Sequence, residues 1–272
     1  MMLLWGILQG LTLIAVFSYM RHLPRERQID APDGVVVILS VRDDWDGGAD
    51  LVARLKAQDR VQFRLIVTTS GRCDAADALA RRERDWVQIV RAGVASDEGQ
   101  KVHKLRAALQ ALREQDRYLV FVDADIAPPA RLLGRLLFPL VRDKADIVTG
   151  YRLLLPGPAP LLMLVGAVEM QLATLPRLAS ATLPWGGAMA MRRETADRLD
   201  LDQMLAGRLS DDMTIGLAGW RARLRLRPVR DLLVASPLDG GSVQALAFGA
   251  RQYRHILTNS PRMWLAATLV VA

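Results

Sequence analysis

The stretch Phe121-Val-Asp-Ala-Asp125-Ile126 ends an apolar run, Tyr118 to Val122, with two carboxylates one residue apart. Such a run is typical of a buried strand, which delivers polar groups to a cleft at its C-terminal end. Side chains alternate along a strand, so Asp123 and Asp125 converge only if the chain bends after it. Converging carboxylates can bind a hard divalent cation, and the cation can hold a diphosphate. The alternative is a solvated turn, where aspartate is common.

The segments around this strand alternate between strand and helix patterns. Buried strands are predicted at residues 34–40, 63–69, 86–90 and 118–122, and helices at 50–58, 75–84 and 101–114. This order predicts an α/β fold with a mostly parallel sheet covered by helices on both faces. Ligands of such sheets bind beyond the carboxyl ends of the strands, where the acid pair lies.

The second half of the chain is less regular. The patterns predict a helix at 128–142, a strand at 145–151, an exposed or edge strand at 221–227 and a helix at 243–257. Residues 153–181 are long, apolar and interrupted by prolines. This segment is either a core helix or a helix lying at the membrane surface, and the surface helix, around residues 160–181, is the favoured interpretation.

Both ends of the chain are apolar. Residues 1–20 carry no charged side chain over the length that spans a bilayer as a helix, and Arg21, Arg25 and Arg27 follow. This pattern predicts an uncleaved transmembrane anchor whose basic flank stays cytoplasmic, with residues 21–33 as a linker. Residues 261–272 are predicted to begin a second apolar membrane segment.

Charge and cysteine content narrow the setting. The formal net charge is +7 and the sequence pI is about 10.1, which favours an anionic partner. No basic stripe with interleaved aromatic residues suits nucleic acid, so an anionic membrane is the expected partner. Cys73 is the only cysteine, which excludes a disulfide framework and fits a reducing, cytoplasmic setting.

Three further segments carry residues suited to chemistry. The first is Leu183-Pro-Trp-Gly-Gly-Ala-Met-Ala190. Its paired glycines allow the backbone to approach a ligand closely, and Trp185 offers a flat face to a sugar or lipid. The alternative interpretation of this segment is an ordinary tight turn. Ser210-Asp-Asp212 starts a predicted helix, either as its cap or with one acid as a general base. Arg251 and Arg254 share a helix face and either grip a phosphate leaving group or face anionic lipid.

In this order the segments resemble a family-2-type glycosyltransferase of the GT-A fold, over roughly residues 34–258. Within that superfamily the chain is most similar to the ceramide glucosyltransferase group, including bacterial relatives that act on lipids such as hopanoids. Gly99-Gln-Lys-Val-His-Lys-Leu105 is similar to the family's Gly-Gln-Lys segment. Asp123 stands at the family's second aspartate and Asp212 at its third, where Ser-Asp-Asp replaces Ser-Glu-Asp. The run from Arg251 to His255 resembles the (Gln/Arg)-x-x-Arg-Trp signature.

Two positions depart from the family pattern. The first aspartate, which contacts the nucleotide, should follow the second strand. Here that strand ends Val67-Thr-Thr-Ser-Gly71, and the nearest acid is Asp74, which stays the candidate. The last position of the signature is His255 instead of Trp, which favours a single transfer because processive polysaccharide synthases usually keep the Trp.

The resemblance implies an inverting transfer of one sugar from a nucleotide-sugar to the hydroxyl of a ceramide- or hopanoid-like lipid. The expected location is the inner membrane, with the catalytic domain in the cytoplasm. The resemblance further implies that Asp123 and Asp125 bind Mg²⁺ or Mn²⁺ and that Asp212 is the catalytic base. The implied donor-binding residues are Lys101, Arg251, Arg254 and Asp74. The implied acceptor wall is Trp185, Gly186 and Gly187, continuing to Ala188.

Two rival functions stay open at this point. One is a processive polysaccharide synthase. The other is a non-catalytic membrane module that binds nucleotide or anionic lipid, which the missing first aspartate favours. The sugar, the nucleotide base and the lipid are not specified by the residues.

Overall fold

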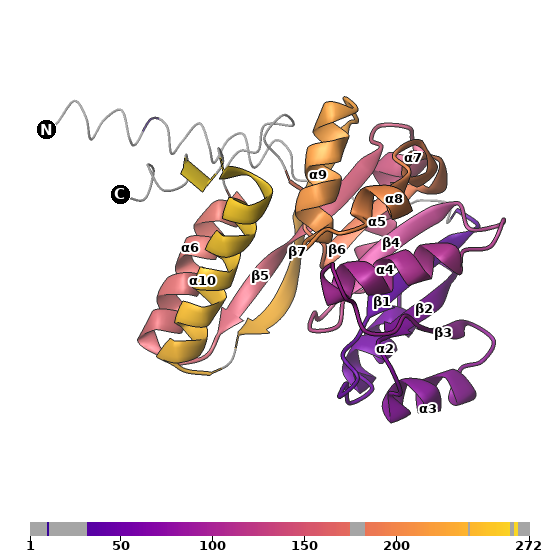
Figure 1. Ribbon diagram of the computed structural model, residues 1–272, viewed down its shortest axis with the longest axis horizontal. Coiled ribbons are helices and arrows are strands. Elements are labelled where there is room, and N and C mark those ends of the chain that lie inside the picture. The colour runs from indigo at the N-terminus through magenta and orange to yellow at the C-terminus, as the bar shows by residue number, and fades with distance from the viewer. Residues whose placement is uncertain (1–9, 11–31, 175–182, 239, 262–263, 266–272) are drawn as a thin grey trace, which may run out of the picture.

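The computed structural model describes residue 10 and residues 32–174, 183–238, 240–261 and 264–265. Its centre is a seven-stranded sheet with the order β3-β2-β1-β4-β6-β5-β7 (Figure 1). The strands are β1 (Val35–Ser40), β2 (Phe63–Thr69), β3 (Val87–Arg91), β4 (Tyr118–Asp123), β5 (Ile147–Pro156), β6 (Ala188–Arg192) and β7 (Leu226–Leu238). The first four are the strands that the sequence predicts, with ends shifted by a residue or two.

Strands β1 to β4 are all parallel, and their register aligns their carboxyl ends. Ser40, the last residue of β1, pairs with Thr68 of β2 on one side and with Asp123 of β4 on the other. Parallel pairing of buried apolar strands is what the continuous apolar runs predict. The register therefore places Asp123 at the edge of the sheet where ligands of this fold class bind.

Strand β6 was not predicted, and it decides the geometry next to the acid pair. It lies between β4 and β5 and runs antiparallel to both, with Val122 opposite Ala188. A strand that runs antiparallel to β4 begins where β4 ends. The turn that precedes β6, Trp185-Gly-Gly187, is therefore brought next to Asp123.

Helices cover both faces of the sheet, as predicted, and divide the core into two clusters. Alternating side chains of β1 separate the clusters: Val35, Val37 and Leu39 face one, and Val36 and Ile38 face the other. The first cluster includes buried residues of α2 (Ala49–Lys56), α3 (Asp74–Arg82) and α5 (Leu132–Val141). The second includes residues of α4 (Gln100–Gln110), α7 (Arg193–Arg198), α8 (Leu201–Leu205) and α9 (Asp211–Arg221).

Two predictions for the second half are wrong in their bounds. Residues 153–181 do not form one helix, because β5 continues to Pro156 in register with β7 and helix α6 (Pro160–Thr174) begins only after it. The alternating stretch 221–227 is also misassigned. Helix α9 extends to Arg221, a turn with Arg223 at a φ of 54° follows, and β7 starts at Leu226. Local sequence patterns cannot show where β5 ends or where β7 begins, because the bounds of these two strands are determined by their pairing with each other. The edge position is correct, since β7 ends the sheet.

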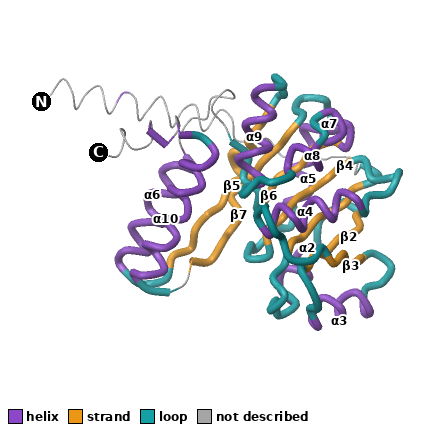
Figure 2. Tube along the Cα trace, viewed as in Figure 1, coloured by secondary structure: helices purple, strands orange, loops and turns teal. Residues whose placement is uncertain are grey.

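Helices α6 and α10 (Ser242–Asn259) contact each other and lie as a pair beside the far ends of β5 and β7. Figure 2 shows this pair set apart from the helices that cover the sheet. The predicted anchor 1–20, most of the linker 21–33, residues 175–181 and most of the segment 261–272 lie outside the described residues. Within the residues that are described, no helix combines the length and apolar composition needed to cross a bilayer.

Candidate active site

The acid pair lies at the end of β4, as predicted, and the chain turns immediately afterwards. Asp123 closes the strand and is half-buried, whereas Asp125 lies in the following turn and is exposed. Partial desolvation of the carboxyl, together with the negative charge of Asp123, raises the pKa of Asp125 above its ordinary value. The positive charges of Lys101 and Arg251 act in the opposite direction. Both cations therefore lie within electrostatic range of Asp125.

Lys101 joins two acids that come from different parts of the fold. Its Nζ lies 2.7 Å from Asp123 Oδ1 and 3.0 Å from Asp211 Oδ2. Desolvation alone would lower the pKa of Lys101, but the charges of Asp123, Asp211 and Asp212 outweigh this and raise the pKa well above its ordinary value. Lys101 is therefore charged whenever the acids are.

The two acids in the first turn of α9, Asp211 and Asp212, have different surroundings. Ser210 is the N-cap, and its hydroxyl accepts from the Met213 N–H at 3.4 Å. Asp212 Oδ1 accepts from Ser210 Oγ at 2.5 Å and from the Met213 N–H at 2.7 Å. Asp211 is buried and faces Lys101, whereas Asp212 is partly exposed, and no described group donates a hydrogen bond to its Oδ2. Asp212 thus keeps one oxygen available to a ligand.

The glycine turn before β6 packs directly on this charged group. A Cβ at Gly186 would lie 2.7 Å from Asp211 Oδ2 and 2.9 Å from Lys101 Nζ. A Cβ at Gly187 would lie 2.3 Å from the Trp185 ring and 2.9 Å from Asp123 Oδ2. Only glycine fits at these distances, so the paired glycines are explained by close approach to the acids. Trp185 packs against the core, and its backbone N–H donates to Thr149 Oγ1 at 2.8 Å.

A buried carboxylate that sequence reasoning missed ties α9 to α4. Glu98 Oε1 lies 2.6 Å from His103 Nδ1, and Glu98 Oε2 accepts from the Gly207 N–H at 3.0 Å and from Arg106 at 3.1 Å. Gly99 donates its N–H to the Arg208 carbonyl at 2.8 Å. Burial would raise the pKa of Glu98, but these partners outweigh it and lower the pKa. The segment before α9 is thereby held on the N-terminal end of α4, which carries Lys101.

Three predicted donor-binding residues make no hydrogen bond or ion pair with the acids of this cluster. Arg251 is exposed on α10 and lies 5.6 Å from the Phe248 ring, and its charge reaches Asp125. Arg254 is exposed on the same helix. Asp74 is 79% exposed at the start of α3 and pairs with Arg72 at 2.7 Å.

Another carboxylate follows β1 and was not predicted. Asp43 Oδ1 accepts from the N–H groups of Ser70 and Gly71 at 2.8 Å and 3.1 Å. These residues follow β2, where the expected first aspartate is absent. Asp43 therefore brings a carboxylate from the neighbouring strand to that loop. No sequence signal identified it, because the contact spans 27 residues and depends on the register of β1 and β2.

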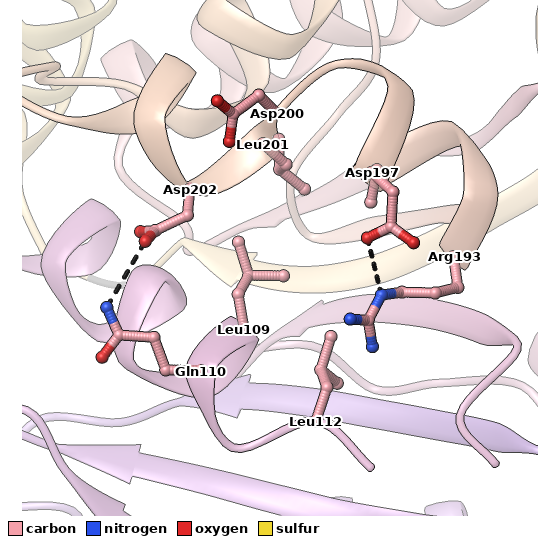
Figure 3. Close-up of a pocket in the computed structure, with 9 residues that line it drawn as sticks. Leu109, Gln110, Leu112, Arg193, Asp197, Asp200, Leu201 and Asp202 are labelled. Atoms are coloured by element: carbon pink, nitrogen blue, oxygen red, sulfur yellow. Dashed lines mark hydrogen bonds and ion pairs between the residues drawn. The ribbon is translucent and has the colours of Figure 1, made fainter. Parts of the chain in front are cut away.

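A separate hollow of about 290 Å³ lies at the opposite end of α4 from Lys101 (Figure 3). Leu109 and Leu112 form the apolar part of its lining. Two acids also line it: Asp197, which is ion-paired with Arg193, and Asp202, which accepts a hydrogen bond from Gln110. None of the predicted site residues lines it.

The donor set at the β4 edge fits a hard divalent cation. Asp123 and Asp125 supply carboxylate oxygens, and Mg²⁺ or Mn²⁺ sites often use one or two carboxylates plus substrate phosphates. Across the residues that the structure describes, no three or more His, Cys, Asp or Glu side chains form a closed metal cage. The arrangement therefore suits a cation shared with a diphosphate.

Comparison with known proteins identifies relatives by sequence and by fold. A family model described as "Glycosyltransferase like family 2" matches residues 32–234. A search of curated proteins finds no match.

Solved structures share the fold at low sequence identity. The mannosyltransferase PcManGT from Pyrobaculum calidifontis, in complex with GDP-Man and Mn²⁺, has a TM-score of 0.62 at 18% identity, covering 92% of this chain and 70% of its own. Glucosyl-3-phosphoglycerate synthase from Mycobacterium tuberculosis, with Mn²⁺ and UDP-glucose, has a TM-score of 0.52 at 17% identity, covering 87% and 84%. TarS 1-349 of S. aureus, with UDP-GlcNAc, has a TM-score of 0.52 at 13% identity, covering 78% of this chain and 60% of its own.

Proposed function

The chain belongs to glycosyltransferase-like family 2, and from that premise we propose that it transfers one sugar from a nucleotide-sugar to a lipid hydroxyl, with inversion at the sugar carbon. The observation that carries the proposal is the meeting of Asp123, Asp125, Lys101 and the start of α9 at the carboxyl edge of the sheet. Residues from three elements that are far apart in sequence converge there. Structurally similar proteins hold Mn²⁺ together with a nucleotide-sugar.

Each residue of the site has a role that its surroundings support. Asp123 and Asp125 would hold Mg²⁺ or Mn²⁺. That cation, when bound, supplies charge neutralisation for the departing diphosphate. Asp212 takes the proton of the acceptor hydroxyl on its free oxygen, and its other oxygen is fixed by Ser210 and Met213. Arg251, whose charge reaches Asp125, would bind the phosphates of the donor.

A lipid acceptor is supported by the outer helix pair. Met163 and Leu164 on α6 and Val243 and Leu246 on α10 are between 56% and 75% exposed. A contiguous patch of exposed apolar side chains marks a membrane or partner surface, and α6 and α10, which carry these four, contact each other. The apolar residues 1–20 and the net charge of +7 agree with an anionic membrane. The acceptor would then reach the site from the leaflet beside Trp185, which is partly exposed, whereas the buried Gly186 and Gly187 pack on the acids.

The decisive experiment is transfer in membranes that contain the full chain. A panel of labelled UDP- and GDP-sugars is supplied with ceramide or hopanoid lipid, and both labelled lipid and free nucleoside diphosphate are measured. We expect one sugar per lipid, dependence on Mg²⁺ or Mn²⁺, and loss of transfer in Asp123→Asn. The matched control is Asp85→Asn, an exposed aspartate that forms no ion pair with a described residue. Full activity in excess EDTA contradicts the metal role.

Other outcomes separate the rival functions. A growing labelled polymer would identify a processive synthase. Nucleotide binding without release of nucleoside diphosphate would identify a binding module.

The double variant Leu164→Glu/Leu246→Glu tests the lipid surface: we expect a raised KM for the lipid and an unchanged KM for the donor. Val94→Glu, at a side chain that is 83% exposed elsewhere, is its control.

A further inference from the structure

Lys101 is not a side chain left free to bind a phosphate, because its ammonium is already paired with two acids. Its ammonium lies between Asp123 at the end of β4 and Asp211 at the start of α9, and Lys101 itself belongs to the first turn of α4. One cation therefore links the three elements that build the site. The Gly186 backbone closes over the link, because any Cβ there would collide with both Lys101 Nζ and Asp211 Oδ2.

Asp211 depends on this cation more than the other acids do. Asp211 is only 5% exposed, and its Oδ2 has no hydrogen-bond partner. Lys101 Nζ lies 3.0 Å from this oxygen, so the two groups form an ion pair without a directed hydrogen bond. A buried carboxylate without a compensating charge is strongly destabilising. Loss of the Lys101 charge would therefore displace Asp211 and the first turn of α9 with it. That turn carries Asp212.

We propose that Lys101 is a positioning residue, whose ion pairs with Asp123 and Asp211 set the distance between the metal-binding carboxylates and the base Asp212. The inference rests on the proposed function for the roles of Asp123 and Asp212. The ammonium also lies 2.7 Å from Asp123 Oδ1, so it competes with a divalent cation for that acid.

Removal of the Lys101 charge has two measurable consequences, one for Mn²⁺ binding and one for turnover. In Lys101→Met the free protein should bind Mn²⁺ alone more tightly, by roughly tenfold, because a like charge next to the site is gone. Turnover should nevertheless fall, on the order of 10²-fold in kcat, because a base displaced by about 1 Å loses that much. The KM for the donor should change much less than kcat.

The experiment measures Mn²⁺ binding by electron paramagnetic resonance and unfolding midpoints in denaturant, alongside kcat and KM. The variants are Lys101→Met, Asp211→Asn and the double variant. We expect each single variant to lower the unfolding midpoint, and the double variant to be more stable than the sum of the two losses, because neither partner is then left unpaired. Lys144→Met removes an exposed lysine that makes no ion pair with a described residue, and should change nothing.

Lys101→Arg keeps the test valid if Lys101→Met does not fold. It retains the charge but not the shape, so stability and donor binding should be largely kept and kcat should fall. The proposal is overturned if Lys101→Met raises only the donor KM and leaves Mn²⁺ affinity unchanged, or if the losses at Lys101 and Asp211 are additive. A wild-type chain without transfer would refute the proposed function instead, and the coupling in unfolding would still be measured.

Discussion

At the scale of the residue, two adjacent aspartates of identical chemistry have different surroundings. Asp211 is buried against Lys101, and Asp212 is partly exposed with one oxygen fixed by the helix cap. A general base needs a fixed orientation and an oxygen that a substrate can reach. The geometry therefore favours Asp212 as the base and Asp211 as a residue that holds the site together.

Substitution of these two acids separates the roles. Asp212→Asn should lower kcat by about 10² to 10⁴-fold, because it removes the proton acceptor, and should leave donor binding intact. Asp211→Asn should lower the stability of the fold as well as kcat. The measurements are kcat, donor affinity by calorimetry, and denaturant unfolding. Loss of turnover in Asp211→Asn together with normal turnover in Asp212→Asn would show that the assignment is reversed.

At the scale of the element, the turn before β6 is where packing and chemistry meet. Its two glycines lie in contact with Lys101, Asp211, Asp123 and the Trp185 ring. Because β6 is antiparallel to β4, this turn can reach the acids only in the observed strand order. The turn is therefore as sensitive to added volume as a core position.

Added volume in this turn should be costly. In Gly187→Ala the new Cβ would lie 2.3 Å from the Trp185 ring and 2.9 Å from Asp123 Oδ2. We expect a loss of about 1–3 kcal/mol in the free energy of unfolding, the usual effect of overpacking, and a fall in activity. The matched control is Gly249→Ala in α10, which has no atom within 4 Å of its Cβ. It should gain about 0.4–1 kcal/mol or be neutral. Equal effects of the two substitutions would contradict this account of the turn.

A second prediction at this scale concerns the ion pair between β2 and the loop before β4. Arg64 donates through Nε to Asp116 Oδ1 at 2.9 Å and through Nη2 to Oδ2, and the Arg113 N–H donates to Oδ2 at 2.7 Å. Burial would raise the pKa of Asp116, but Arg64 and the Arg113 N–H outweigh it and lower the pKa. The folded pKa is thus below the unfolded value of about 3.9. The stabilisation is complete above that value and is lost as pH falls through the folded pKa.

Asp116→Asn measures this contribution directly. At pH 7 the variant should lose on the order of 3–5 kcal/mol in the free energy of unfolding, because Arg64 keeps its charge without a partner. The difference from the wild type should be smaller at pH 3 than at pH 7, because below about 3.9 the carboxyl is protonated in the unfolded wild type and the stabilisation falls as pH drops toward the folded pKa. Urea unfolding at both pH values checks this. A difference that is constant with pH would mean that the Arg64 pair contributes little.

At the scale of the whole molecule, the predicted membrane topology can be measured directly. The predicted anchor at residues 1–20 and the basic residues that follow it in the sequence predict a catalytic domain in the cytoplasm. Cys73 is buried and unsuited to labelling, but Val94 is 83% exposed in the loop after β3. In Val94→Cys an impermeant maleimide should label the chain only after the inner membrane is permeabilised. Labelling in spheroplasts with an intact inner membrane would reverse the topology.

The sequence by itself was sufficient for the parallel half of the fold and for the position of the acid pair. Continuous apolar runs identify β1 to β4, because a strand buried on both faces has no other composition. Asp123 follows the last of these runs, and strand register then carries it to the ligand edge. Ser210 as a helix cap was also readable, since capping is a local interaction.

Only the tertiary structure decided what lies opposite those acids. Strand β6, the extension of β5 to Pro156 and the start of β7 at Leu226 all result from pairing between segments far apart in the chain. The contacts of Lys101 with Asp211, of Glu98 with Gly207 and of Asp43 with Ser70 have the same origin. Local patterns record which face of an element is buried, but not which element it meets. The residues of the site are therefore visible in the sequence, whereas their partners are set by the strand order.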